Sequence, residues 1–213
     1  MKYMIINGSP RKKCNTAQML ASCADGIKSV DKNAEIKEIN VYDYNFTGCR
    51  SCFACQMKAN AEHKGCKIKD GIFELLEEAR RCDGLVFGSP VYFFDQTAQL
   101  KAFLERLLYP GKSEKTIHSA FIYTMNAPEE IAKQLHFDIT LGAAEQFLKA
   151  NFNAEPQRIC SYNTFQYNDK EIYTDGFRSM VNEKKKWHDE QFPIDLQNAF
   201  AAGAAMAKAV GSI

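Results

Sequence analysis

The sequence predicts a single α/β domain built on a doubly wound, five-stranded parallel sheet of strand order 2-1-3-4-5, with helices on both faces. Three observations predict it. Short apolar runs alternate with segments whose apolar residues recur at helical spacing. The strand-like runs are short and apolar, which is typical of strands covered on both sides. The 213 residues suit one sizeable domain, 1–213, better than several small ones.

The first third of the chain predicts two strands and one helix. Met4–Asn7 continues a short apolar run and predicts a strand, and Ala34–Asn40, with two isoleucines, predicts a second. Thr16–Ser29 between them places its apolar residues on one helical face. From about residue 45 to residue 69 no steady period is present, so we expect a cysteine-rich loop there.

The middle third predicts a buried strand between two helices. Asp70 is expected to cap a helix whose apolar residues continue to Ala79. Gly84–Phe87 predicts a short buried strand, followed by a loop over Gly88–Phe94. Thr97–Leu108 carries its leucines and phenylalanine on one side and predicts an amphipathic helix.

The last third completes the predicted sheet. Ile117–Thr124 and Arg158–Tyr162 predict the fourth and fifth strands, and Pro128–Ala150 is expected to be mostly helical. The polar, aromatic segment from about 163 to 193 is expected to be irregular. An alanine-rich helix over Ile194–Val210 then closes the domain.

Composition and charge exclude several classes of function. A net charge of +1 gives no strong field toward nucleic acid or a membrane surface. No apolar segment approaches the roughly 20 residues of a membrane span, and no secretory leader is apparent, so a cytoplasmic location is expected. No nucleophile–histidine arrangement or carboxylate pair has local support, so we expect no hydrolase and assign no catalytic side chain.

The loop Gly8–Thr16 stands where parallel α/β proteins bind phosphate. It follows the first strand and leads into the first helix, whose N-terminal N–H groups and dipole attract anions. Ser9, Asn15 and Thr16 add short polar side chains, and Arg11 adds charge. The loop lacks the two best-known phosphate motifs, and it suits a mononucleotide phosphate such as that of FMN. The alternative is a capped surface turn.

The loop Gly88–Phe94 lies at the carboxyl end of the third strand, on the other side of the crevice. Gly88, Ser89 and Pro90 permit close approach of a flat redox-active ring, and Tyr92 and Phe93 offer apolar cover. The alternative is that these aromatic side chains simply pack the end of the sheet. Both loops lie at the expected ligand crevice, and both are rich in residues suited to binding a flavin. This coincidence favours a flavin site.

Four of the eight cysteines are grouped as Cys49-x2-Cys52-x2-Cys55-x10-Cys66. They are candidate ligands of a [4Fe–4S] cluster, of a structural zinc ion, or of no metal, as free or disulfide-forming thiols. The first two spacings are those of bacterial ferredoxins, but the last gap is longer. The other four cysteines are expected to act as small apolar residues.

These motifs resemble those of the NAD(P)H-dependent FMN reductases, and more narrowly the iron-sulfur flavoprotein branch of the flavodoxin-like superfamily. The resemblance is carried from Met1 to about Arg106 by Gly8–Thr16, the four cysteines and the Gly88–Phe93 and Gln99–Arg106 stretches. It implies that Ser9, Arg11, Asn15 and Thr16 hold the FMN phosphate. It implies that Pro90, Val91, Tyr92 and Phe93 line the flavin ring, with Ser89 beside them. It also implies a third contact from Thr124, Met125 and Asn126. Cys14 stands where the family commonly has glycine.

The resemblance implies an oxidoreductase that passes electrons from NAD(P)H through FMN to a quinone, a flavin, a nitro compound or a protein acceptor. One alternative is an electron carrier with a [4Fe–4S] cluster on the cysteine loop. Another is a flavin- or thiol-based redox sensor. A homodimer or homotetramer is expected, because reductases of this class commonly place the flavin at a subunit boundary.

Overall fold

The computed structural model describes residues 1–60, 65–109, 111–166 and 175–212, the last range with side chains from Val181 onward. Five parallel strands form the sheet in the order β2-β1-β3-β5-β6. They comprise β1 (Lys2–Asn7), β2 (Glu35–Asn40), β3 (Gly84–Tyr92), β5 (His118–Thr124) and β6 (Gln157–Ser161). With the short strand β4 (Asp95–Gln96) set aside, this is the predicted order 2-1-3-4-5.

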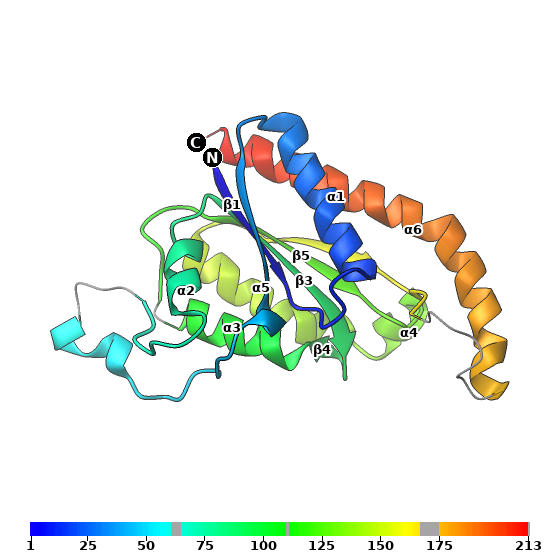
Figure 1. Cartoon of the computed structure of the whole chain (residues 1–213), viewed down its shortest axis with the longest axis horizontal. Coiled ribbons are helices and arrows are strands. Elements are labelled where there is room, and N and C mark those ends of the chain that lie inside the picture. The colour runs from blue at the N-terminus through cyan, green and yellow to red at the C-terminus, as the bar shows by residue number, and fades with distance from the viewer. Residues whose placement is uncertain (61–64, 110, 167–174, 213) are drawn as a thin grey trace.

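Helices cover both faces of the sheet, as predicted (Figure 1). One face carries α1 (Asn15–Val30) and α6 (Asp175–Val210), which lie side by side. The other carries α2 (Phe73–Ala79), α3 (Ala98–Leu108) and α5 (Phe137–Phe152). The short α4 (Glu129–Gln134) follows β5. Within the described ranges, none of the helices combines the length and apolar character needed to span a bilayer.

The central strands are buried on both sides, as their apolar sequences require. In β1, Met4 and Ile6 pack toward α2 and α3, while Tyr3 and Ile5 pack toward α1 and α6. Strands β3 and β5 divide their side chains in the same way. On α1, the predicted apolar face is buried. Two separate hydrophobic clusters therefore hold the sheet between its helical layers.

Several elements differ from the sequence prediction. Strand β3 continues through Tyr92 and turns into β4, where a loop was expected over Gly88–Phe94. The predicted helix 128–150 is two helices, because His136 adopts a left-handed backbone conformation, with φ of 55°. Asp70 does not cap α2: its carboxylate accepts hydrogen bonds from the Ile72 backbone and from a buried arginine.

The largest difference concerns the segment expected to be irregular. Helix α6 begins at Asp175 and continues through Pro193, so 175–193 is helical, not irregular. Residues 163–166 do form a loop, and 167–174 lie outside the described residues. The sequence of the first half of α6 is mostly polar, and proline usually ends a helix. The sequence therefore lacks the apolar stripe that would predict a helix here, and Pro193 falsely indicates a helix boundary.

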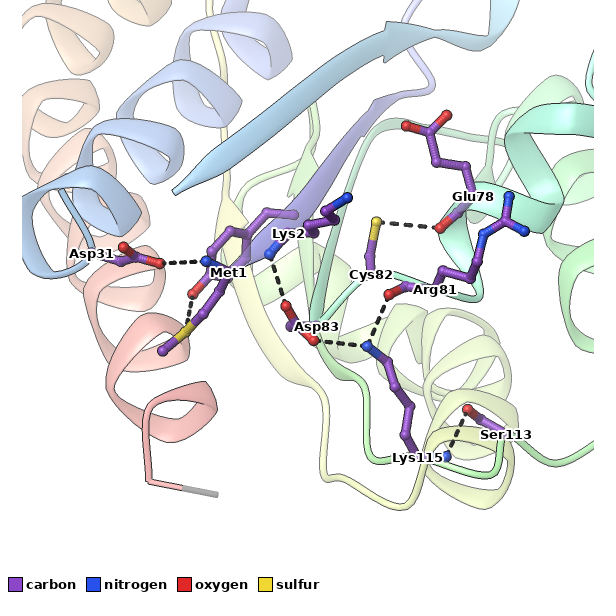
Figure 2. A network of polar contacts seen from close by, with 10 residues as sticks. Met1, Lys2, Asp31, Glu78, Arg81, Cys82, Asp83, Ser113 and Lys115 are labelled. Atoms are coloured by element: carbon purple, nitrogen blue, oxygen red, sulfur yellow. Dashed lines mark hydrogen bonds and ion pairs between the residues drawn. The ribbon is translucent and has the colours of Figure 1, made fainter. Parts of the chain in front are cut away.

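A network of polar contacts connects the N-terminal ends of the strands, at the end of the sheet opposite the predicted ligand crevice (Figure 2). Asp83, just before β3, accepts hydrogen bonds from the backbone N–H of Lys2 (2.8 Å) and from Nζ of Lys115 (2.7 Å). The Met1 amino group pairs with Asp31 at 3.3 Å. These contacts join β1, β3 and the entry to β5.

Replacing Asp83 with asparagine should destabilise the fold by about 0.5–1 kcal/mol at pH 7, because the half-exposed pair with Lys115 is lost. Burial opposes ionisation of Asp83, but the hydrogen bonds from Lys115 and Lys2 outweigh it and lower its pKa. Its stabilisation is therefore complete above the unfolded pKa of about 3.9 and is lost as the pH falls through the lower folded pKa. Urea unfolding at pH 7 and at acidic pH should show the difference between the two proteins disappearing in acid. A difference that persists in acid would contradict this assignment.

Candidate functional site

The first candidate site lies at the carboxyl ends of β1 and β3, where the strand order reverses. The backbone N–H of Gly8 donates to the Gly88 carbonyl over 2.7 Å, and Thr97 Oγ1 donates to the Gly8 carbonyl, also over 2.7 Å. A Cβ at Gly8 would lie 2.8 Å from the Cβ of Leu100 and 2.9 Å from the Gly88 carbonyl oxygen. The close approach of the two loops therefore requires glycine at this position.

The loop after β1 delivers an N-terminus without a side-chain cap to the crevice. Cys14 is the N-cap residue of α1, and its side chain makes no capping hydrogen bond. The first backbone N–H groups of α1 therefore receive no hydrogen bond acceptor from the side chain of the N-cap residue. This arrangement suits an anion.

A cavity of about 220 Å³ opens above this N-terminus. Ten of the twelve predicted cofactor residues line it, together with three residues that the sequence analysis did not select. The predicted ones are Ser9, Arg11, Asn15, Thr16, Pro90, Val91, Tyr92, Phe93, Thr124 and Asn126, and the additional ones are Cys14, Thr164 and Gln166.

Two predicted residues lie behind the cavity wall rather than on it. Ser89 is fully buried, where its hydroxyl donates to the Pro90 carbonyl (2.8 Å) and accepts from the Thr97 backbone (3.0 Å). Met125 is buried in the core, and its carbonyl accepts hydrogen bonds from the backbone and the side chain of Thr164. Both residues support the wall.

Cross-loop hydrogen bonds hold the polar side of the cavity. Arg11 donates from its guanidinium to the Gln166 carbonyl over 2.7 Å, and the Asn15 amide donates to the Phe165 carbonyl over 2.8 Å. The hydroxyls of Thr16 and Thr124 are 2.8 Å apart. These bonds join α1 and the loop before it to the end of β5 and to the loop after β6. The loop after β6 was expected to be irregular, which is why Thr164 and Gln166 were missed.

The charge around the cavity favours an anionic ligand. Arg11 reaches the cavity, whereas Lys12 forms an ion pair with Asp43 away from it. No carboxylate occurs among the described residues that line the cavity. The donors at the α1 N-terminus fit a phosphate. The Pro90–Tyr92 backbone beside them fits a flat ring, so the residues present are compatible with FMN.

The aromatic tip of the second loop has an unusual backbone. Phe93 and Phe94 form a two-residue turn between β3 and β4, with φ values of 48° and 70°. Left-handed conformations cost aromatic residues about 1–3 kcal/mol each and are frequent at functional sites. Phe93 is 98% exposed and lines the cavity at its mouth. Phe94 instead packs edge-on against Phe137.

The four grouped cysteines surround a second, much smaller cavity of about 20 Å³. Burial, and then the charges of the three neighbouring thiols, raise the pKa of Cys55, although a backbone hydrogen bond opposes the shift. All eight cysteines are free. The thiols converge, but among the described residues no group of histidine, cysteine or carboxylate side chains is already arranged to hold a metal ion.

Arg106 of α3 fixes this cysteine loop to the domain. The arginine is only 1% exposed, and its Nε donates to Cys66 Sγ over 3.3 Å. The guanidinium also donates to the carbonyls of Thr47 and Ile68 and pairs with Asp70 at 2.5 Å. One buried side chain therefore binds both flanks of the loop. In the sequence, Arg106 is recognisable only as the last residue of the Gln99–Arg106 family motif.

Comparisons with known proteins identify the family of this chain. A family model described as NADPH-dependent FMN reductase matches residues 1–127, which include the first three loops of the larger cavity. An iron-sulfur flavoprotein of Archaeoglobus fulgidus is 37% identical over 106 residues, covering 50% of this chain and 48% of that protein. Another, from Methanocaldococcus jannaschii, is 33% identical over 106 residues, covering 50% and 51% of the two chains. The chain spans about half the length of the curated relatives it matches.

Solved structures confirm the flavodoxin-like fold over 96–97% of the chain. An NAD(P)H:quinone oxidoreductase from Methanothermobacter marburgensis superposes with a TM-score of 0.65 and 15% identity, covering 96% of each chain. An FMN-dependent NADH-azoreductase from Bacillus anthracis, solved with FMN, gives 0.63 and 11% identity, covering 97% of this chain and 99% of that one. At these identities the likeness establishes the fold alone. The family match covers more than half of the chain and confirms the resemblance stated from the motifs: the protein belongs to the NADPH-dependent FMN reductase family.

Proposed function

We propose that the protein is an FMN-dependent oxidoreductase that passes electrons from NAD(P)H to a quinone, a flavin, a nitro compound or a protein acceptor. The cavity at the carboxyl ends of β1 and β3 carries the proposal. There, ten of the twelve cofactor residues expected from the sequence line one cavity, at an α1 N-terminus without a side-chain cap. No carboxylate occurs among the described residues of that lining. Family membership supports the same chemistry.

The chain's own residues have binding and orienting roles in this proposal. Ser9, Arg11, Asn15 and Thr16 would hold the phosphate, with the N–H groups of α1. The Pro90–Tyr92 wall and the loop containing Asn126 would border the ring. FMN, when bound, supplies the hydride and electron transfer.

The direct test is reconstitution of the purified protein with FMN. We expect saturable binding, visible flavin absorption on the protein, and steady NAD(P)H oxidation with a quinone acceptor. A protein that binds no added FMN would overturn the proposal. FMN binding without turnover of any acceptor would instead favour the redox-sensor alternative, in which the flavin or the cysteine loop signals through a partner.

Arg11→Ala should weaken FMN binding by about 10- to 100-fold, because a charge-assisted contact to phosphate contributes about 1.5–3 kcal/mol. Lys13→Ala is the matched control: Lys13 lies on the same loop, is exposed, and does not line the cavity. Fluorescence titration of the two variants gives both dissociation constants. Equal losses in both variants would indicate a general charge effect instead of a phosphate contact.

The four convergent thiols favour a second candidate function, an electron carrier with an iron-sulfur cluster on the cysteine loop. The names of the curated relatives point the same way. Since the thiols are not already arranged as a metal site, ligation would require the loop to close around the metal. Anaerobic purification followed by iron and sulfide analysis tests it. Stoichiometric zinc would support the structural alternative, and neither metal would support free thiols.

We propose that a second copy of the chain covers the apolar groove between α3 and α5. The groove has a volume of about 600 Å³, and Phe147 on its rim is 63% exposed. Phe147→Glu should convert a homodimer or homotetramer into a smaller species in light scattering at micromolar concentration. Ile194→Glu, at a half-exposed site on the opposite helical layer, should leave the mass unchanged. A monomeric wild-type protein would contradict the assembly.

A further inference from the structure

A buried lysine stands behind the wall that the proposed function assigns to the flavin ring. Lys184 projects from α6 and is only 5% exposed. Its Nζ donates to the Asn126 carbonyl over 2.8 Å and to Asn163 Oδ1 over 2.6 Å. Asn126 lines the cavity, so this one residue separates the ammonium group of Lys184 from a ligand bound there.

The partners of Lys184 are neutral. No carboxylate of the described chain forms an ion pair with it, whereas its neighbour on the helix, Lys185, pairs with Asp189. Burial lowers the pKa of Lys184, although the nearby charge of Glu183 opposes this. Both of its contacts are acceptors, which is the arrangement that an ammonium donor requires. The ammonium group of Lys184 is therefore buried at a cost in desolvation free energy and is hydrogen-bonded to neutral oxygens instead of to a carboxylate.

The same contacts give Lys184 a mechanical role. Asn163 adopts a left-handed conformation, with φ of 50°, and its backbone N–H donates to the Ala127 carbonyl over 2.9 Å. Thr164 bonds to Met125 in the same pairing of loops. Lys184 thus joins the loops after β5 and β6 at the point where they present Asn126 and Thr164 to the cavity.

We propose that Lys184 is a positioning residue that sets the reduction potential of bound FMN. Its ammonium group fixes the Asn126 loop and places a positive charge behind the cavity wall, so that the pocket binds reduced FMN more tightly relative to oxidised FMN. The proposal rests on the proposed function and names a residue outside residues 1–127, the part of the chain matched by the family model.

The test compares the wild-type chain with Lys184→Met, Lys184→Gln and the control Lys186→Met, whose lysine is exposed on the same helix. The glutamine variant retains a donor but not the charge. We expect both Lys184 variants to lose at least tenfold in the affinity for reduced relative to oxidised FMN, which is a fall of about 30 mV in a two-electron potential. The control should keep the wild-type potential.

Three readouts separate the possible outcomes: FMN affinity, the midpoint potential from spectroelectrochemical titration, and the melting temperature of the FMN-free protein. A lower potential in Lys184→Gln without a lower melting temperature supports the proposal, and this variant decides the matter if Lys184→Met does not fold. A wild-type potential in an FMN-loaded Lys184→Gln overturns the role of Lys184 alone. Failure of the wild-type chain to bind FMN overturns the proposed function, and the role of Lys184 with it.

Discussion

Gly203→Ala should lower the stability of the domain by about 3 kcal/mol, because it forces apart the two helices on one face of the sheet. A Cβ at Gly203 of α6 would lie 2.0 Å from the Cys23 carbonyl oxygen of α1. That atom is backbone, so no change of side-chain rotamer relieves the clash. Overpacking costs typically 1–3 kcal/mol and sometimes more, which outweighs the helix propensity gained from alanine.

Where α1 and α6 cross, each helix has a glycine packed against the backbone of the other. A Cβ at Gly26 of α1 would meet the Phe200 carbonyl oxygen of α6, also at 2.0 Å. Both glycines lie where α1 and α6 cover the same cluster of buried side chains. Because the N-terminus of α1 also forms the floor of the proposed FMN cavity, displacement of α1 should weaken FMN binding as well.

Thermal unfolding measures the effect: a loss of 3 kcal/mol in a chain of this size corresponds to a melting temperature about 10 °C lower. Gly142→Ala on α5 is the matched control, since a Cβ there meets only the end of the Arg158 side chain, at 3.1 Å. It should change stability by less than about 1 kcal/mol. A Gly203→Ala protein as stable as this control would show that the two helices are not in backbone contact.

The sheet could be predicted from the sequence because its central strands are buried on both faces. Such strands appear as short continuous apolar runs, and β1, β3 and β5 fit this description at Met4–Asn7, Gly84–Phe87 and Ile117–Thr124. The strand order followed from their alternation with helices. The first half of α6 was not predicted to be helical. Its sequence is mostly polar and lacks the periodic apolar residues on which the prediction of a helix depends.

The candidate site was predictable where a residue lies at or just beyond the carboxyl end of a strand. Ser9 and Pro90 were selected in this way, Thr124 was selected through the family resemblance, and all three line the cavity. Residues that reach the site from elsewhere carried no local signal. Thr164 and Lys184 both lie in the segment that was expected to be irregular, yet Thr164 lines the cavity and Lys184 is buried.

Arg106→Met should have the second large effect, a loss of about 3–5 kcal/mol, because removing one partner of a buried ion pair leaves the other uncompensated. Asp70 would lose the guanidinium that now satisfies it, and its side chain is only 19% exposed. The Thr47 and Ile68 carbonyls would lose donors at the same time. Arg81→Met, at an exposed site, should cost less than about 0.5 kcal/mol.

The loss should be concentrated in the cysteine loop, because Arg106 binds both of its flanks while the rest of α3 packs through leucine and phenylalanine side chains. We therefore expect Cys66 to react faster with a thiol reagent in Arg106→Met, with little change in the buried Cys23. Adding Asp70→Asn should recover part of the stability, since it removes the stranded carboxylate. If the double variant is no more stable than Arg106→Met, the carbonyl contacts of Arg106, rather than its ion pair, hold the loop in place.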